Sequence, residues 1–265
     1  MHVLDRGDGE LAFLDRGHGP ATPVLLVHGM PFDHTMWRDH IDRLARDRRV
    51  LAVDQRGFGA STGPPAQWSG YADDLAALLA HRGISEAVVV GFSVGGLVTL
   101  DLQHRHPHLV AGLVLVDTSA GPDPDPDGRR ALADRIEREG MDPYTVETLY
   151  RMIRPDCTET IVEHVLTMMR DADPAGVAVA HRLRADCPDH RRRLPSIAVP
   201  TAVIVGADDE FTPLAEAHEL ARIPGAELTV VDRAAHMPPV EQPEVFAAAL
   251  DRLLDRIDAA QRSAA

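Results

Sequence analysis

One serine stands among small residues where an apolar run ends, in the segment VVVGFSVGGL at residues 88–97. The residues from Gly91 to Gly95 fit the pattern G-x-S-x-G, in which a strand, a sharp turn and a helix present a serine hydroxyl. The strained turn requires small neighbours two residues before and after the serine, and both glycines meet that need. The glycine spacing does not match the dinucleotide-binding pattern G-x-G-x-x-G. We therefore predict that Ser93 is a nucleophile.

A serine hydroxyl attacks well only when a nearby base takes its proton. Of the 14 histidines, His236 is the best placed, in the loop RAAHMPP between the last expected strand and the last expected helix. Its imidazole needs a carboxylate that fixes the tautomer. We choose Asp209, while its neighbour Asp208 and the more distant Asp117 stay as alternatives. The order serine, acid, histidine is the one expected for a triad on such a turn.

The negative oxygen that forms during acyl transfer needs fixed donors, and backbone N–H groups serve this purpose. We assign them to Met30, in the turn HGMPFDH, and to Val94, at the amino end of the helix after the serine. His28, in the same turn, is expected to shape the loop by hydrogen bonding. A weak metal alternative comes from QHRHPH, whose three alternate histidines share no obvious helix face. These are His104, His106 and His108.

Short apolar runs alternate with helix-like segments along most of the chain. Several runs lack polar alternation, which is typical of strands buried on both faces of a parallel sheet. The expected strands are residues 23–29, 48–54, 86–91, 111–117, 201–206 and 226–232, and the expected helices are 36–47, 68–83, 94–107, 214–224 and 243–257. This order predicts an α/β fold with a mostly parallel, doubly wound sheet. The first residues predict an antiparallel hairpin that turns at Gly7 to Gly9.

Residues 119–196 break this rhythm, because they contain apolar residues at helical spacing and no convincing strand. We predict a helical cap there, inserted after the sixth strand into a core formed by 1–118 and 197–265. The segment GPDPDPDG at 121–128 is expected to be a stiff, exposed, non-helical connector. The cap carries several methionines, which pack the cap or line an irregular apolar pocket. They are Met141, Met152, Met168 and Met169.

Composition limits the partners. The chain has 265 residues, 45% of them hydrophobic, which is enough for a full core. Its 41 acidic side chains outnumber 27 basic ones, giving a formal net charge of -14 that disfavours nucleic acid and anionic membranes as partners. We find no signal-peptide pattern and no apolar run of about 18 residues, so we expect a cytoplasmic protein. Cys157 and Cys187 are expected to be packing residues.

Five segments in sequence order resemble the motifs of the α/β-hydrolase superfamily. They are VHGMPFDHTMW, AVDQRGFGAS, GFSVGG, VIVGADDEFTP and AAHMPPVEQPEVF. The resemblance extends from about residue 10 to 258 and is nearest to small esterases, enol-lactonases and cofactor-free haloperoxidase-like proteins. It favours Asp209 over Asp208 as the acid and implies that Asp54 and Arg56 belong to a structural turn. It also implies the same nucleophile, base and oxyanion donors: Ser93, His236, Met30 and Val94.

We therefore predict a serine hydrolase that cleaves a small, fairly apolar carboxylic ester or lactone through an acyl-enzyme, with no metal or organic cofactor. Alternatives are perhydrolase or haloperoxidase chemistry, carbon–carbon hydrolysis or a biosynthetic cyclisation with the same triad, a ligand receptor on this scaffold, and a purely structural module. The sequence does not indicate the oligomeric state. Four side chains next to the predicted site are candidates to contact substrate or to brace the site: Phe32, Trp37, Phe92 and Met237.

Overall fold

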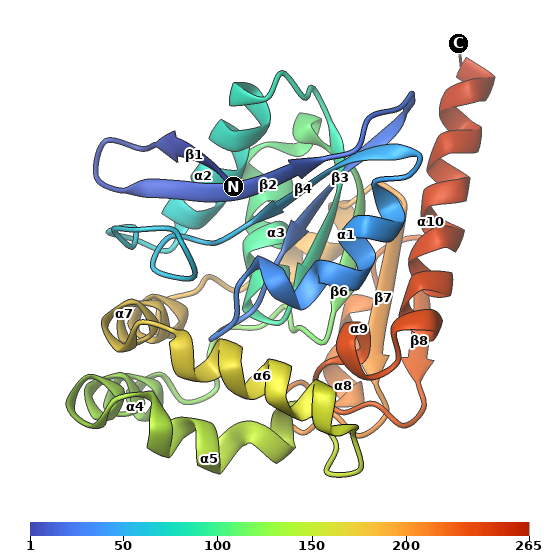
Figure 1. The fold of residues 1–265 in the computed structure, drawn as a ribbon. Coiled ribbons are helices and arrows are strands. Elements are labelled where there is room, and N and C mark those ends of the chain that lie inside the picture. The colour runs from blue at the N-terminus through green and yellow to red at the C-terminus, as the bar shows by residue number, and fades with distance from the viewer. Residues whose placement is uncertain (265) are drawn as a thin grey trace.

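The computed structural model describes residues 1–264. Its centre is an eight-stranded sheet with the order β1-β2-β4-β3-β5-β6-β7-β8 (Figure 1). The strands are β1 His2–Asp5, β2 Glu10–Arg16, β3 Ala21–Val27, β4 Arg48–Val53, β5 Ala87–Phe92, β6 Val110–Val116, β7 Thr201–Gly206 and β8 Glu227–Val231. β1 pairs with β2, and β2 with β4, in antiparallel fashion, while the other neighbours are parallel. The predicted mostly parallel sheet with an N-terminal antiparallel hairpin is confirmed.

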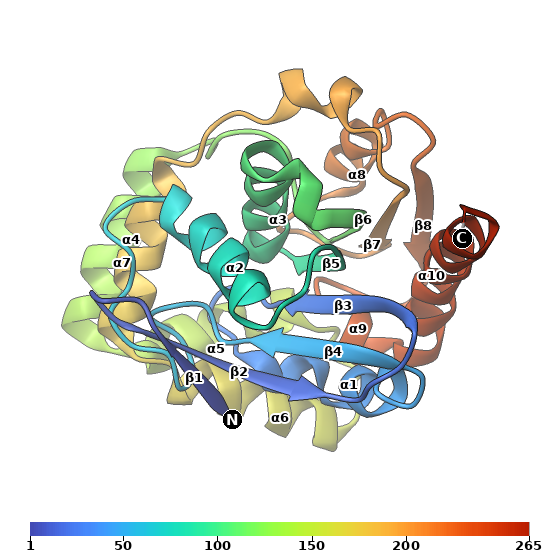
Figure 2. The same cartoon turned by 90° about the horizontal axis from the view of Figure 1, so that it is seen from above.

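Helices cover both faces of the sheet, as Figure 2 shows. One face carries α1 (Arg38–Leu44) and α10 (Pro243–Ala264), and the other carries α2 (Ser69–His81), α3 (Val94–Arg105) and α8 (Leu214–Leu220). In β3, Val24 and Leu26 pack into the core on the first face, whereas Leu25 and Val27 pack into the core on the second. Because successive strand side chains point to opposite faces, covering both faces requires the unbroken apolar runs seen in the sequence.

Short helical turns and one long helix complete the sheet layer. The turns are η1 His34–Trp37, η2 Pro107–Leu109, η3 Arg191–Ser196 and α9 Pro238–Glu241. The long helix is α10, which has 22 residues and packs Phe246, Leu250 and Leu253 into the core. In the part of the chain that the structure describes, no helix combines the length and apolar character needed to cross a bilayer.

Four α-helices lie between β6 and β7, where helices without strands were expected. They form a layer beyond one end of the sheet strands (Figure 1). Their bounds are α4 Pro126–Glu139, α5 Met141–Met152, α6 Glu159–Asp171 and α7 Pro174–Ala185. The expected boundaries of the cap at 119 and 196 stay a prediction. We use the name cap for these four helices and the segments that join them to the sheet.

The proline-rich connector differs from the expectation of a stiff, exposed and non-helical segment. Helix α4 already begins at Pro126, because a proline in the first turn costs no hydrogen bond and Asp125 caps the helix by accepting from the Gly128 N–H at 3.0 Å. Asp123 is buried rather than exposed, and its carboxylate accepts from Arg129. The connector is therefore anchored to the cap by an ion pair.

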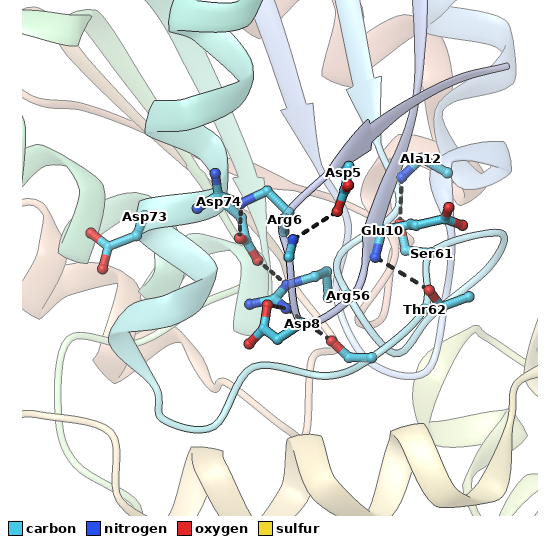
Figure 3. Close-up of polar contacts among 12 residues, drawn as sticks. Asp5, Arg6, Asp8, Glu10, Ala12, Arg56, Ser61, Thr62, Asp73 and Asp74 are labelled. Atoms are coloured by element: carbon cyan, nitrogen blue, oxygen red, sulfur yellow. Dashed lines mark hydrogen bonds and ion pairs between the residues drawn. The ribbon is translucent and has the colours of Figure 1, made fainter.

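The loop after β4 fixes the N-terminal hairpin, as the resemblance implied for this turn. The Arg56 guanidinium donates to Asp74 at 2.7 Å and also to Asp8, and Arg6 donates to the second oxygen of Asp74 at 2.8 Å (Figure 3). Asp54 accepts two backbone N–H bonds from the adjoining loops. These contacts join the hairpin, the loop and α2, so Asp54 and Arg56 make structural contacts.

Candidate active site

Ser93 lies on a strained turn between β5 and α3. Its φ and ψ angles are 53° and -119°, a conformation that side-chain-bearing residues rarely adopt. Two hydrogen bonds hold it there: the Ser93 N–H donates to the Val116 carbonyl at 2.8 Å, and the Thr118 hydroxyl donates to the Ser93 carbonyl at 2.6 Å. Such strain persists only where the surroundings enforce it, and it is concentrated at functional sites.

The glycines on either side of Ser93 are required by close packing. A Cβ added at Gly91 would lie 2.3 Å from the Thr99 hydroxyl oxygen, and one added at Gly95 would lie 2.4 Å from the His28 carbonyl oxygen. Both distances are far inside van der Waals contact. The structure therefore supplies the physical reason for the glycines of the G-x-S-x-G pattern.

Ser93, His236 and Asp209 form a chain of hydrogen bonds. The His236 Nε2 atom lies 2.9 Å from the Ser93 Oγ, and its Nδ1 lies 2.9 Å from the Asp209 Oδ2. An ionised carboxylate can only accept, so Nδ1 carries the proton and Nε2 is free to accept from the serine hydroxyl. The three residues come from the carboxyl ends of β5 and β7 and from the loop after β8. The geometry is that of a serine–histidine–acid triad.

Asp209 is held in its ionised form. Burial alone would raise the pKa of this carboxyl, but the charge and hydrogen bond of His236 and the hydroxyl of Thr212 lower the pKa below its usual value. Its second oxygen accepts from the backbone N–H groups of Phe211 at 2.8 Å and Thr212 at 3.2 Å. A carboxylate fixed in this way keeps the imidazole in one tautomer and favours its protonated state during reaction.

The two alternative acids lie elsewhere. Asp208 pairs with Arg154 at the surface and makes no contact with His236. Asp117 lies beneath the triad, where one of its oxygens accepts the Gly206 N–H at 2.8 Å. The Asp117, Asp209 and His236 side chains place ligand atoms within 4.8 Å of one another. Complete burial, and then the negative charge of Asp209, raise the pKa of Asp117 well above its ordinary value.

Met30 and Val94 both line the cavity that contains Ser93. Within residues 1–264, neither of their backbone N–H groups donates to another protein atom. The turn after β3 passes directly against the serine, since a Cβ added at Gly29 would lie 2.8 Å from the Ser93 Cβ. Two free N–H groups beside a nucleophile match the requirement for stabilising an oxyanion.

Sequence reasoning missed two contacts that position His236. The buried Glu241 carboxylate accepts the N–H groups on either side of the histidine, from Ala235 at 2.9 Å and from Met237 at 3.0 Å. The His236 N–H itself donates to the Met152 carbonyl, at the end of α5, at 3.1 Å. The only sequence signal for the first contact was a glutamate five residues after the histidine, and the second had none.

A cavity of about 570 Å³ opens between the sheet and the cap. We define its core wall by residues that belong to the sheet layer, and its cap wall by residues that belong to the cap. The core wall includes Met30, Ser93, Val94, Leu97, Phe211 and His236. The cap wall includes Asp123, Arg129, Tyr144, Met152, His181 and Arg184. The chemistry-bearing groups thus face a cap surface that contains several charges.

The four predicted substrate contacts do not lie among the residues that line this cavity. All of them are buried in the hydrophobic core, so we expect them to brace the site. The Phe92 ring lies 5.0 Å from the His236 ring, and Phe32 lies 6.0 Å from Phe92, measured between ring centroids. Trp37 packs on Phe246, and Met237 is fully buried. Adjacency in sequence did not indicate the direction of these side chains.

The remaining candidate residues have structural partners. His28 accepts the Gln55 N–H at 2.9 Å through Nε2 and bonds the Gly29 carbonyl through Nδ1, as expected for a residue that shapes its loop. His106 faces Asp73 at 3.2 Å. Both cysteines are free thiols. Of the four cap methionines, Met152 lines the cavity, and the other three pack into the core: Met141, Met168 and Met169.

Two groups of side chains within residues 1–264 place possible metal ligands close together. One is the triad with Asp117. The other contains Asp33, His34 and Asp54, where the His34 Nδ1 lies 2.7 Å from Asp54. Within these groups, hydrogen bonds join His34 to Asp54 and His236 to Asp209. Within the same residues, the three alternate histidines at the end of α3 and just after it do not form such a group.

Comparison with known proteins identifies the family of the chain. The profile of the Alpha/beta hydrolase family matches residues 24–249. A thermophilic esterase from Thermogutta terrifontis is 38% identical, with a TM-score of 0.88 and 96% of each chain covered. An enol-lactonase from Burkholderia xenovorans is 26% identical, with a TM-score of 0.89, 96% of this chain and 100% of that chain covered. A pimeloyl-[acyl-carrier protein] methyl ester esterase from Aromatoleum aromaticum is 31% identical over 83% of this chain and 93% of its own. The chain therefore belongs to the alpha/beta hydrolase family.

Proposed function

We propose that this protein is a serine hydrolase that cleaves a small carboxylic ester or lactone through an acyl-enzyme. The observation that carries the proposal is the hydrogen-bond chain from Ser93 through His236 to Asp209, with both distances at 2.9 Å, at the wall of a cavity. The similarity to esterases and to an enol-lactonase supports ester bonds as the target. The protein is thus a hydrolase that acts on ester bonds.

The geometry supports a two-stage reaction. His236 takes the proton of Ser93 through Nε2 as the serine oxygen attacks the ester carbonyl, and Asp209 stabilises the imidazolium that forms. The N–H groups of Met30 and Val94 hold the negative oxygen of the tetrahedral intermediate. Protonated His236 then gives its proton to the leaving alcohol. A water molecule repeats the sequence on the acyl-enzyme, and Ser93 is regenerated.

The size and lining of the cavity support a small substrate. A volume of about 570 Å³ lies within the range of small-molecule sites. Around the serine the core wall is mainly apolar, with Met30, Val94, Leu97 and Phe211. This lining supports the expected apolar character for the part of the substrate next to the scissile bond.

A fluorophosphonate probe tests the proposal, because it phosphonylates a serine only when that serine is activated. We expect mass spectrometry to find the label on Ser93 and no label on the Ser93→Ala variant. Ser119 lines the same cavity and provides a matched control, so Ser119→Ala is expected to be labelled like the wild type. Label at another residue, or none in folded protein, would contradict the proposal. Product analysis with ester, peroxide and diketone substrates separates ester hydrolysis from perhydrolysis and carbon–carbon cleavage.

A further inference from the structure

The cap wall contains a buried arginine that lacks hydrogen-bond partners. Arg184, on α7, is 5% exposed, and its guanidinium donates no hydrogen bond to any of residues 1–264. The nearest carboxylate oxygen belongs to Asp123, 3.7 Å from the Arg184 Nη1. Burial lowers the pKa of Arg184, which reflects the loss of hydration around its charge. A buried guanidinium normally has carboxylate or carbonyl oxygens at hydrogen-bond distance.

His181, one turn earlier on α7, presents a second buried donor on the same wall. It is 2% exposed, and its Nδ1 lies 3.2 Å from the Arg129 Nη1, from which it accepts. Burial, and then the charge of Arg129, lower the pKa of His181 to about 3, so the ring is neutral. A neutral ring whose Nδ1 accepts carries its proton on Nε2. This Nε2 is buried and has no partner within the described chain.

The charges of the cap wall do not cancel. Four arginines line the cavity, namely Arg129, Arg151, Arg184 and Arg191. Three carboxylates lie in the same lining, namely Asp123, Asp125 and Glu216, and Arg151 and Arg191 pair with Glu210 and Asp189 outside it. At the cap wall the imbalance is local, because the single carboxylate of Asp123 faces both Arg129 and Arg184. One anionic group of a ligand would balance this set.

Leaving buried donors without acceptors costs free energy, and the cost is larger for a charged group. The fold keeps two such donors, Arg184 and His181, in the wall opposite the serine. We propose that they bind a carboxylate of the substrate, so that the substrate of this hydrolase is an ester or lactone that also carries one ionised carboxyl group. This inference rests on the proposed function, because it assigns the substrate class of the same cavity. A planar carboxylate matches the paired donors of a guanidinium, and its single charge would balance the cap wall, where Asp123 alone faces Arg129 and Arg184.

Matched substrates test the inference on the wild-type protein. The monomethyl ester of a linear dicarboxylic acid and the methyl ester of the corresponding alkanoic acid have the same scissile bond and differ in the terminal carboxylate. We expect kcat/KM to be about 10–100-fold higher for the carboxylate-bearing ester, the range of a charged hydrogen bond. Acetyl esters of hydroxy acids and of simple alcohols repeat the comparison with the carboxylate on the alcohol side. Equal or lower values for the carboxylate-bearing esters on both sides would overturn the inference.

Variants connect this preference to Arg184. Arg184→Gln is expected to reduce the ratio of the two kcat/KM values about tenfold or more, mainly through KM. The ratio is the readout, so a general loss of activity cancels. Arg182→Gln is the matched control: Arg182 lies on the same helix, but it is more exposed and pairs with Asp134 and Glu137 on α4. This control is expected to keep the wild-type ratio. An unchanged ratio in Arg184→Gln would overturn the inference, and if that variant does not fold, Arg184→Lys is expected to keep part of the preference.

A binding measurement separates this inference from the proposed function. In Ser93→Ala, calorimetry with the same monomethyl ester is expected to detect binding that weakens about tenfold or more when Arg184→Gln is added. Carboxylate binding without hydrolysis of any ester would contradict the proposed function and retain the carboxylate site. Labelling of Ser93 and hydrolysis of neutral esters, without a carboxylate preference, would do the reverse.

Discussion

The core wall and the cap wall of the cavity differ in how their polar groups are paired. Behind the core wall, Asp209 accepts from four donors, and on that wall His236 is bonded on both ring nitrogens. On the cap wall, Arg184 makes no hydrogen bond within residues 1–264, and His181 has a free Nε2. The side chains of Asp209 and His236 are thus fully paired, whereas the cap wall lacks an acceptor. We infer that the core wall determines the reaction and the cap wall selects the molecule.

The largest expected effect comes from removing the nucleophile on the core wall. Ser93→Ala should lower turnover of an activated ester by roughly three to six orders of magnitude, the size of triad effects. The loss should be the same for neutral and carboxylate-bearing esters, because the change does not touch the cap wall. Steady-state kinetics with both substrates checks this. An unchanged rate in a clean preparation would contradict the assignment.

Asp209→Asn should have the next largest effect. An amide can donate a hydrogen bond to Nδ1, which favours the tautomer that cannot take the serine proton, and this costs about four orders of magnitude in kcat in a comparable triad. Asp208→Asn is the matched control, since Asp208 pairs with Arg154 and does not reach the imidazole. We expect that control to keep nearly full activity. A similar loss in both variants would mean that the acid has been misassigned.

Glu241→Gln should have a smaller effect, through the position of His236. One oxygen, Oε1, accepts both neighbouring N–H groups, and the other, Oε2, accepts the Arg154 N–H at 2.8 Å; a glutamine NH2 group in place of Oε2 removes that acceptor, so the loop loosens. We expect kcat to fall by up to about a hundredfold, as for small misplacements of a catalytic group, and the free energy of unfolding to fall by about 1–3 kcal/mol. The exposed Glu244→Gln is the control. A thermal melt and a KM measurement accompany the assay, and a lower Tm with unchanged kcat would limit Glu241 to stability.

Asp117→Asn should change the rate least of these variants. Its main effect should be on the free energy of unfolding and its dependence on pH. The raised pKa of Asp117 means that the folded protein holds a proton that the unfolded chain releases above pH 3.8. Its contribution to stability is therefore present at acid pH and is lost as the pH rises toward the folded pKa. The asparagine does not titrate, so the variant should be more stable than the wild type at pH 7. Each kcal/mol gained in the free energy of unfolding should raise Tm by about 2–4 °C. The gain should shrink as the pH falls toward 4. A gain that instead grows as the pH falls would show that Asp117 is ionised.

Most of the sheet and the triad could be predicted from the sequence because their signals are local. A buried parallel strand needs a continuous apolar run, and the elbow at Ser93 needs glycines at fixed spacing. His236 and Asp209 each follow such a strand, and parallel strands bring their carboxyl ends to one edge of the sheet. The order of the three residues in the chain and their positions after strand ends were therefore enough to predict that they lie close together.

The cap wall could not be predicted in the same way. Asp123 and Arg184 are 61 residues apart and meet because α4 packs on α7, a contact that no short motif encodes. The directions of Phe32 and Trp37 were also hidden, because proximity to a catalytic loop does not tell whether a ring faces the cavity or the core. The start of α4 at Pro126 was missed because alternating prolines suggested a continuous connector, although a proline is well suited to the first turn of a helix.

The hydrogen bond from the His236 N–H to the Met152 carbonyl has a consequence for how such caps can be exchanged between relatives. The last carbonyls of a helix have no partner inside that helix, and one of those at the end of α5 accepts the N–H of His236, the proposed general base. A cap grafted from a relative would have to place an acceptor oxygen at the same point. Otherwise the His236 N–H would lose its hydrogen bond. The cap and the His236 loop thus share one hydrogen bond, so a different cap is compatible with this sheet layer only if it keeps that acceptor.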